Sequence, residues 1–117
     1  MNYRSIRYSD VLLMAAEANN RKASADDAKA QNYLNQVRAR AFGNDSQASS
    51  STGATLTQEI WDERRLELAM EGHRFFDLVR TGEAAAKVSW FISGKHEVFP
   101  IPQSEIDISG LTQNSGY

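Results

Sequence analysis

Three glutamates, Glu63, Glu67 and Glu71, follow one another at four-residue spacing. In a helix this spacing places them, together with Arg64, in one stripe about 80° wide. Two carboxylates a few ångströms apart are what glycoside hydrolysis requires, because one acts as the general acid and the other as the nucleophile or base. The spacing therefore raises the possibility of a hydrolase, which has to be weighed against a structural role.

The structural role explains the arginines better. Like charges four residues apart destabilise an isolated helix by a few tenths of a kcal/mol, so cations must approach this stripe. Arginines also keep carboxylates ionised, whereas a general acid needs a raised pKa. We therefore predict no catalytic residue here, but a structural ion-pair network that fixes the register of packed helices; Arg4 is an alternative to Arg7. The predicted members are Arg7, Glu63, Arg64, Glu67, Glu71, Arg74, Asp77 and Arg80.

Other chemistries lack their residues. His73 and His96 are the only histidines, and neither belongs to a pair with the spacing of metal ligands. Cysteine is absent, which removes thiolate ligands, disulfides and a cysteine nucleophile. The sequence contains neither a Gly-x-Ser-x-Gly turn nor a glycine-rich phosphate loop. We expect no metal site and no cofactor.

Aromatic side chains are the remaining candidates for ligand contact, since their faces can stack on sugar rings. Trp90 and Phe91 are the ligand-binding candidates. Trp61 lies at helical spacing with Leu68 and is predicted to be in the core. Core positions are also predicted for Phe75, Phe76 and Phe99.

Composition excludes several classes of protein. The chain has 117 residues and a formal net charge of -2, which suits a single domain spanning residues 1–117 and argues against a nucleic-acid binder. The longest apolar run, residues 11–16, is far shorter than the roughly 20 residues of a membrane-spanning helix. The N-terminal residues do not have the pattern of a signal peptide.

Hydrophobic periodicity predicts a helical hairpin at residues 8–20 and 26–41, typical of tetratricopeptide-like proteins. Asp10 and Glu17 form the one polar stripe of the first helix, whose other sides are apolar. Gln31, Asn35 and Arg38 are assigned to the solvent face of the second. A further helix pair is predicted at residues 57–72, capped by Thr57, and at 73–80.

The remaining segments read as less regular. Residues 44–55 are rich in Ser, Thr and Gly and predict an exposed flexible loop. Residues 83–94 are ambiguous, with helix favoured at 84–87 and a strand possible at 88–92. The prolines predict an extended segment at 96–101, and residues 111–117 read as loop. The predicted fold class is mainly α: a helical hairpin, a further helix pair, and an irregular C-terminal segment that contains proline.

The order of the motifs resembles the C-terminal region of the SusD/RagB family of outer-membrane nutrient-binding lipoproteins. The matching segments are RYSDVLLMAAEAN from Arg7, LNQVRARA from Leu34, ERRLELAMEGHRFFDLVR from Glu63, PIPQSEI from Pro100 and QNSGY from Gln113. Small departures are Ser9, Met70 and Ser115, where the family commonly has Ala, an aromatic residue and Pro. A larger departure is length, because family members are several times longer.

The resemblance implies a binding protein and not a hydrolase. It implies an outward-facing position on the outer membrane, through a lipid anchor absent from this chain. The expected partners are a SusC-like TonB-dependent transporter and an oligosaccharide or other nutrient, bound through a longer parent chain. On this view the chain is mainly scaffold. The alternative hypothesis is a small helical adaptor that binds another protein through the apolar side of its first two helices.

Overall fold

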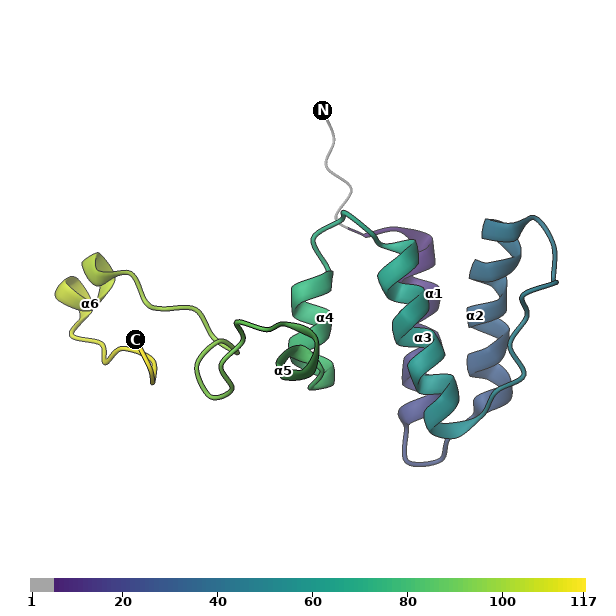
Figure 1. Cartoon of the computed structure of the whole chain (residues 1–117), viewed down its shortest axis with the longest axis horizontal. Helices are drawn as coiled ribbons and strands as arrows, with labels where there is room; N and C mark the ends of the chain where they lie inside the picture. The colour runs from purple at the N-terminus through teal and green to yellow at the C-terminus, as the bar shows by residue number, and fades with distance from the viewer. Residues whose placement is uncertain (1–5) are drawn as a thin grey trace. The chain divides into compact units, whose positions relative to one another are not determined.

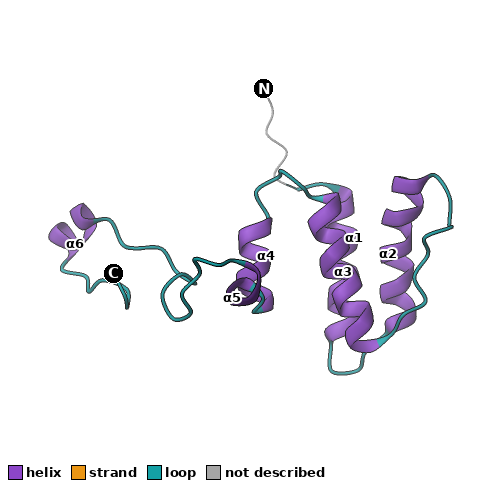
Figure 2. Cartoon of the chain, in the orientation of Figure 1, coloured by secondary structure: helices purple, strands orange, loops and turns teal. Residues whose placement is uncertain are grey.

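The computed structural model describes residues 6–117, and the described chain folds into helices without a strand (Figure 2). This confirms the predicted mainly α fold class. None of the helices is both long enough and apolar enough to cross a membrane. The helices are α1 (Tyr8–Arg21), α2 (Asp27–Phe42), α3 (Gly53–Glu67), α4 (Arg74–Thr81), α5 (Ala84–Lys87) and α6 (Gln103–Ser109).

The chain divides into two compact units, Met1–Arg74 and Phe75–Tyr117, and each is described by itself. In the first unit α1, α2 and α3 lie side by side, and α1 packs against both of the others (Figure 1). Their shared core is aliphatic because each helix contributes apolar residues at helical spacing. The core residues are Leu12, Leu13, Ala16, Ala30, Leu34, Val37, Leu56 and Ile60, with Tyr33 packed against them.

The predicted helix ends are close to the observed ones except at α3. The side chain of Asp26 caps α2 by accepting a hydrogen bond from the Lys29 amide, and Gly43 ends α2 in the left-handed conformation. α3 begins one turn before Thr57, at Gly53, whose φ of 54° favours glycine. Thr57 is therefore not the cap; its hydroxyl donates to Asn20 and to the Gly53 carbonyl.

α1 buries the two carboxylates assigned to its polar stripe and exposes part of its apolar surface, although Leu12, Leu13 and Ala16 lie in the core. Asp10 and Glu17, the predicted polar stripe, are only 4% and 8% exposed. The apolar Val11 and Met14 are 44% and 45% exposed. Periodicity alone assigns polar residues to solvent, but a carboxylate turns inward where a buried cation receives it. In α1 the interior therefore contains charge, and part of the apolar surface lies outside.

The Ser-rich loop between α2 and α3 is held along α2 and is not free. Asn35 donates to the Ser49 carbonyl and accepts from the Ser49 amide, and Gln31 donates to the Ser51 carbonyl. Arg38 also reaches the loop, at the Gln47 carbonyl. Gln31, Asn35 and Arg38 are therefore not a solvent face, because they satisfy the polar backbone of a loop that has no helix or sheet of its own.

The second unit has short helices and few buried side chains. Residues 84–87 form α5 as favoured, but 88–92 form no strand. Turns occupy residues 93–97, so the predicted extended segment is wrong at its start, and α6 was not predicted. The 111–117 loop folds back: Gln113 exchanges two hydrogen bonds with the Ile101 backbone, and Tyr117 donates to the Val98 carbonyl.

Candidate functional site

The charged stripe of α3 is partly buried in the first unit, where Arg64 makes the most deeply buried contact. Its Nη1 lies 2.7 Å from Oδ1 of Asp10 on α1, and the two side chains are only 7% and 6% exposed. A buried charge is costly unless it is paired, so each group requires the other. This pair fixes how α1 and α3 pack.

A second group of charges joins the start of α1 to the end of α3. Arg7 donates from Nε to Glu71 at 2.9 Å and from Nη1 to Glu67 at 2.9 Å. Its Nη2 donates to the Glu67 carbonyl at 2.6 Å, which satisfies a backbone group at the end of α3. Arg40 on α2 also pairs with Glu67. One carboxylate therefore connects all three helices of the unit.

Glu63 faces α2. It accepts a hydrogen bond from Nε of Arg38 at 2.8 Å, and the same arginine reaches Glu59 at 3.1 Å. Glu63 is 8% exposed. Arg38 and Arg40 were missed as partners because their position on α2 alone does not show that they lean toward α3.

Asp77 and Arg80, two further predicted members of the network, belong to α4. Asp77 and Arg80 pair with each other within α4, at 2.8 Å and with 14% and 41% of their side chains exposed. Among residues 6–117 no ion pair includes Arg74, and Arg4 lies outside the described residues. The structure thus brings together Arg7, Glu67 and Glu71, but pairs Glu63 and Arg64 with partners the sequence did not identify.

Asn20 is a further residue that sequence reasoning missed, since it was taken only as a helix end. It is 6% exposed at the end of α1. Its amide donates to Asp27 at 2.8 Å and to the Gly53 carbonyl at 3.2 Å. Asp27 in turn accepts from the Gly53 amide at 2.7 Å. The end of α1 thereby joins the starts of α2 and α3.

Arginines favour the ionised form of Glu67 and Glu71. Burial works against the charge of Glu67, but hydrogen bonds from Arg7 and Ser9 and the charge of Arg40 outweigh it, so the Glu67 pKa is below its ordinary value. The hydrogen bond from Arg7 likewise lowers the pKa of Glu71. The hydrogen bond to Glu71, and after it the hydrogen bond to Glu67, raises the pKa of Arg7. A carboxylate with a lowered pKa is a poor general acid, so this arrangement stabilises packing and does not donate protons.

Metal ligands are not gathered anywhere in the described chain: residues 6–117 contain no group of three or more His, Asp or Glu side chains that could hold an ion. His73 and His96 are not metal-ligand pairs in the sequence either.

The second unit holds an aromatic cluster around Phe75. Trp90 stacks on Phe75 with a centroid distance of 6.2 Å and an interplanar angle of 12°, and Phe91 lies 6.3 Å away at a tilt. His96 meets both Trp90 and Phe91 edge to face at 5.7 Å. As whole residues, Trp90, Phe76 and Phe99 are more than 60% exposed, so the core assignment of Phe76 and Phe99 is wrong.

Trp61 in the first unit is half-buried, and the guanidinium of Arg21 lies 5.5 Å from its ring centre. Its indole nitrogen is buried without a hydrogen-bond partner among the described residues.

The sequence is similar to those of known proteins, and this similarity shows the family. Residues 1–98 match the SusD family. The chain belongs to the SusD family. Proteins named SusD-like are similar to this chain in sequence. SusD-like protein P25 of Formosa agariphila is 34% identical over 128 residues, which cover 95% of this chain. SusD-like protein P2 of the same organism is 40% identical over 85 residues, which cover 68% of this chain.

These relatives are much longer. The aligned regions are 24% of P25 and 17% of P2, so this SusD-family chain spans about a quarter or less of their length. A third relative, SusD-like protein P38, is 36% identical over 67% of this chain and 16% of its own.

Proposed function

We propose that this chain is the helical scaffold portion of a SusD-family protein that captures an oligosaccharide or other nutrient for a SusC-like TonB-dependent transporter. The parent protein would lie on the outward face of the outer membrane, held by a lipid anchor carried outside these residues. Residues 1–117 would form one C-terminal SusD/RagB-like region of that parent. The family match over residues 1–98 is the observation that supports this proposal.

The way the charges are paired supports the scaffold role. The carboxylates of Asp10, Glu63 and Glu67 are all directed at arginines of neighbouring helices, at 2.5 to 2.9 Å. Carboxylates and guanidinium groups that bond one another have few acceptors and donors left for a sugar hydroxyl. The ion-pair network, as first predicted from the sequence, is therefore proposed to hold helices together while ligand contacts come from elsewhere.

Trp90 and Phe91 remain the proposed ligand-contact residues of this chain. Trp90 is 63% exposed and stacks on Phe75. The face of its indole ring that points away from Phe75 is therefore a flat apolar surface, called the plate below. Phe91 is half-buried and would support the plate more than touch a ligand. A single plate gives weak affinity, which agrees with a scaffold that completes a site formed by the longer protein.

The scaffold proposal is tested by affinity electrophoresis and calorimetry of the 117-residue chain against a panel of neutral and acidic glycans. We expect little or no binding, and we expect Trp90→Ala to remove whatever retardation is seen. Phe76→Ala is the matched control, because Phe76 is equally exposed in the same cluster. Tight, saturable binding by this chain alone would contradict the scaffold role.

A helical adaptor is the alternative, supported by the exposed apolar side chains of α1. Tyr8, Val11 and Met14 are 74%, 44% and 45% exposed, and they belong to one helix. The two functions differ in the partner they require. Co-purification of a TonB-dependent transporter with the parent protein favours the SusD-like function, whereas a stable complex with a soluble protein alone favours the adaptor.

A further inference from the structure

The aromatic cluster of the second unit contains a histidine with one nitrogen used by the fold and one left over. His96 is half-buried, and its ring centre lies 5.7 Å from the ring centres of Trp90 and Phe91. Its Nδ1 accepts a hydrogen bond from the Ile92 amide at 2.9 Å. Because an amide N–H only donates, Nδ1 has no proton, and a neutral imidazole of this kind has its proton on Nε2. The fold therefore selects the tautomer in which Nε2 is a donor.

The Nε2 donor of His96 is not used elsewhere. Within residues 6–117 it has no hydrogen-bond partner. It is not buried either, because the buried side-chain nitrogen without a partner in this part of the chain belongs to Trp61. A donor that is exposed and unbonded is available to a ligand. The short distance between the rings of His96 and Trp90 places this donor next to the plate.

The turn that contains His96 is held in place by further contacts. The backbone amide of His96 donates to the Ile92 carbonyl at 3.0 Å, so these two residues exchange hydrogen bonds across the turn. Tyr117 contacts the turn on both sides of His96: Nζ of Lys95 lies 4.6 Å from the centre of its ring, and its hydroxyl donates to the Val98 carbonyl. A side chain that is already ordered does not lose further entropy when a ligand binds. His96 is therefore a preorganised donor.

A flat apolar surface beside a fixed donor suits a sugar ring. The C–H face of a pyranose stacks on an aromatic ring, while the oxygens at its edge accept hydrogen bonds. We infer that Trp90 and His96 form one sugar subsite, in which a pyranose lies on the plate and one of its oxygens accepts a hydrogen bond from Nε2 of His96. This inference rests on the proposed function, from which the choice of a sugar as ligand comes, and it adds His96 as a ligand-contact residue.

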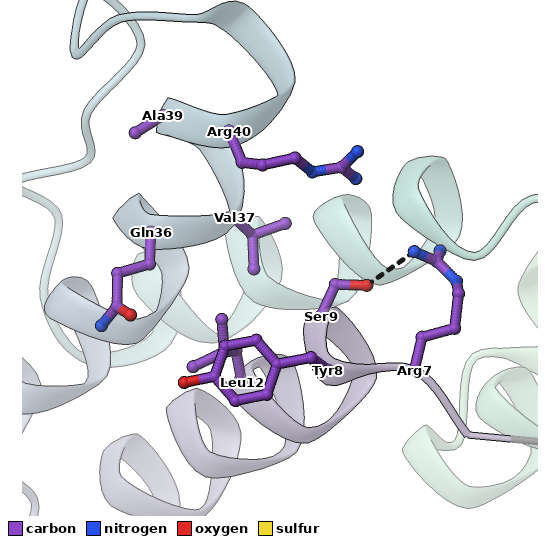
Figure 3. Close-up of a pocket in the computed structure, with 8 residues that line it drawn as sticks. All are labelled: Arg7, Tyr8, Ser9, Leu12, Gln36, Val37, Ala39 and Arg40. Carbon is purple, nitrogen blue, oxygen red and sulfur yellow. Dashed lines mark hydrogen bonds between the residues drawn. The ribbon is translucent and has the colours of Figure 1, made fainter.

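A pocket of the first unit is the alternative location for a small ligand. It has a volume of about 500 Å³ and lies between the start of α1 and the end of α2 (Figure 3). Its lining includes the exposed ring of Tyr8 and the polar side chains of Ser9, Gln36 and Arg40. Within residues 6–117 no aromatic ring packs on Tyr8, whereas Trp90 is stacked on Phe75. The aromatic cluster is therefore the better ordered stacking surface, and the experiment has to distinguish the two locations.

The test is an NMR titration of the ¹⁵N-labelled 117-residue chain with cellobiose, mannobiose and chitobiose. His96→Asn removes the Nε2 donor but keeps a side-chain oxygen that can accept from the Ile92 amide. His73→Asn is the matched control, because His73 is the other histidine and belongs to the first unit. Trp90→Ala removes the plate, and Tyr8→Ala removes the ring of the alternative pocket. Unchanged dispersion of the amide spectrum shows that each variant is folded.

A long-range ¹H–¹⁵N spectrum of the unmodified chain locates the proton of His96 directly. We expect it on Nε2, and we expect sugar to shift Nε2 more than Nδ1 and to move the indole signal of Trp90 but not that of Trp61. The expected dissociation constants are on the order of millimolar to tens of millimolar. His96→Asn weakens binding by about 2- to 10-fold, as the loss of one neutral hydrogen bond does. Trp90→Ala abolishes binding, while His73→Asn and Tyr8→Ala leave it unchanged.

Several results would overturn the subsite. They are a proton on Nδ1, an unchanged affinity of His96→Asn, and shifts at residues 8–12 and 36–40 without one at Trp90. Absence of binding by all three sugars up to about 100 mM overturns it as well, but leaves the scaffold proposal intact, because that proposal expects little binding by this chain. Tight binding that His96→Asn weakens supports the contact of His96 and contradicts the scaffold role. The two proposals can therefore fail separately.

Discussion

Ion pairs in this chain differ in how strongly water screens them, and the screening decides how much each pair contributes to the stability of the fold. Arg64 and Asp10 are at most 7% exposed, so their contact is screened little and neither can be rehydrated. Lys87 and Glu83 are 50% and 19% exposed and 4.0 Å apart, where an ion pair contributes about 0 to 1 kcal/mol. The count of ion pairs is therefore a poor guide to stability here, and burial is the better one.

Breaking the buried pair is expected to be severe. Asp10→Ala leaves Arg64 buried without this carboxylate, which lowers the free energy of unfolding by about 3 to 5 kcal/mol in urea titration. The double variant Asp10→Leu with Arg64→Met removes both charges and is expected to recover most of the loss. Lys87→Ala is the surface control and should change stability by less than about 1 kcal/mol. If Asp10→Ala and Lys87→Ala both lowered stability by the same small amount, the buried Arg64–Asp10 pair would not be the main contributor to stability.

Glu67 makes stability depend on acid pH. Its pKa is lower in the folded chain than the ordinary value of 4.5, so the unfolded chain binds the proton more readily. The stabilisation is present above pH 4.5 and is lost as pH falls through the lower, folded pKa. Glu67→Gln is expected to reduce stability by about 1 to 3 kcal/mol at pH 7 and to differ little from the unmodified chain in strong acid.

The control for this prediction is Glu105→Gln, on an exposed face of α6 and without an ion pair in the described chain. Urea midpoints between pH 7 and pH 3 measure both variants. A stability gap for Glu67→Gln that stays constant across this range would show that the carboxylate acts through packing and not through its charge.

At the scale of elements, the sequence was sufficient where a helix is rich in Ala and Leu, is free of Gly and Pro, and has a recognisable end. α1 and α2 were predicted to within a residue or two because Ala, Leu and Val recur at helical spacing and Gly43 marks an end. The start of α3 was missed because Gly53 and Ala54 follow a Ser-rich run and read as loop. What starts the helix there is the contact of Gly53 with Asp27 and Asn20, which are distant in sequence.

The turn that follows α3 contains a strained residue. Met70 has φ of 67°, a conformation that costs a non-glycine residue about 1 to 2 kcal/mol, and its side chain is fully exposed. Met70→Gly is expected to stabilise the chain by about 0.5 to 1 kcal/mol, since glycine tolerates this φ but has more entropy to lose. Met70→Ala keeps the backbone cost and should be neutral in thermal unfolding. Equal stabilisation by both variants would attribute the effect to the exposed side chain instead.

At the scale of the whole molecule, the sequence predicts which charges need compensation but not which side chains touch. It predicted the cluster of Glu63, Glu67 and Glu71 with arginines, because like charges at this spacing need compensation. It could not show that Arg38 and Arg40 lean from α2 toward α3, or that Asp10 faces inward, since these depend on how the three helices pack. Helix register is a tertiary property, and a single sequence contains it only indirectly.

The distribution of buried side chains predicts that the first unit folds on its own and that the second does not. All residues of the aliphatic core lie before Arg74, whereas the buried apolar residues of the second unit are Leu78 and Ala84. A chain of residues 1–74 is therefore expected to fold alone and to unfold cooperatively in circular dichroism, because it retains its core and the Arg64–Asp10 pair. Residues 75–117 alone should show little cooperative unfolding, since so small a core does not offset the entropy of ordering the chain. A cooperative transition in the second piece, or its absence in the first, would contradict this division.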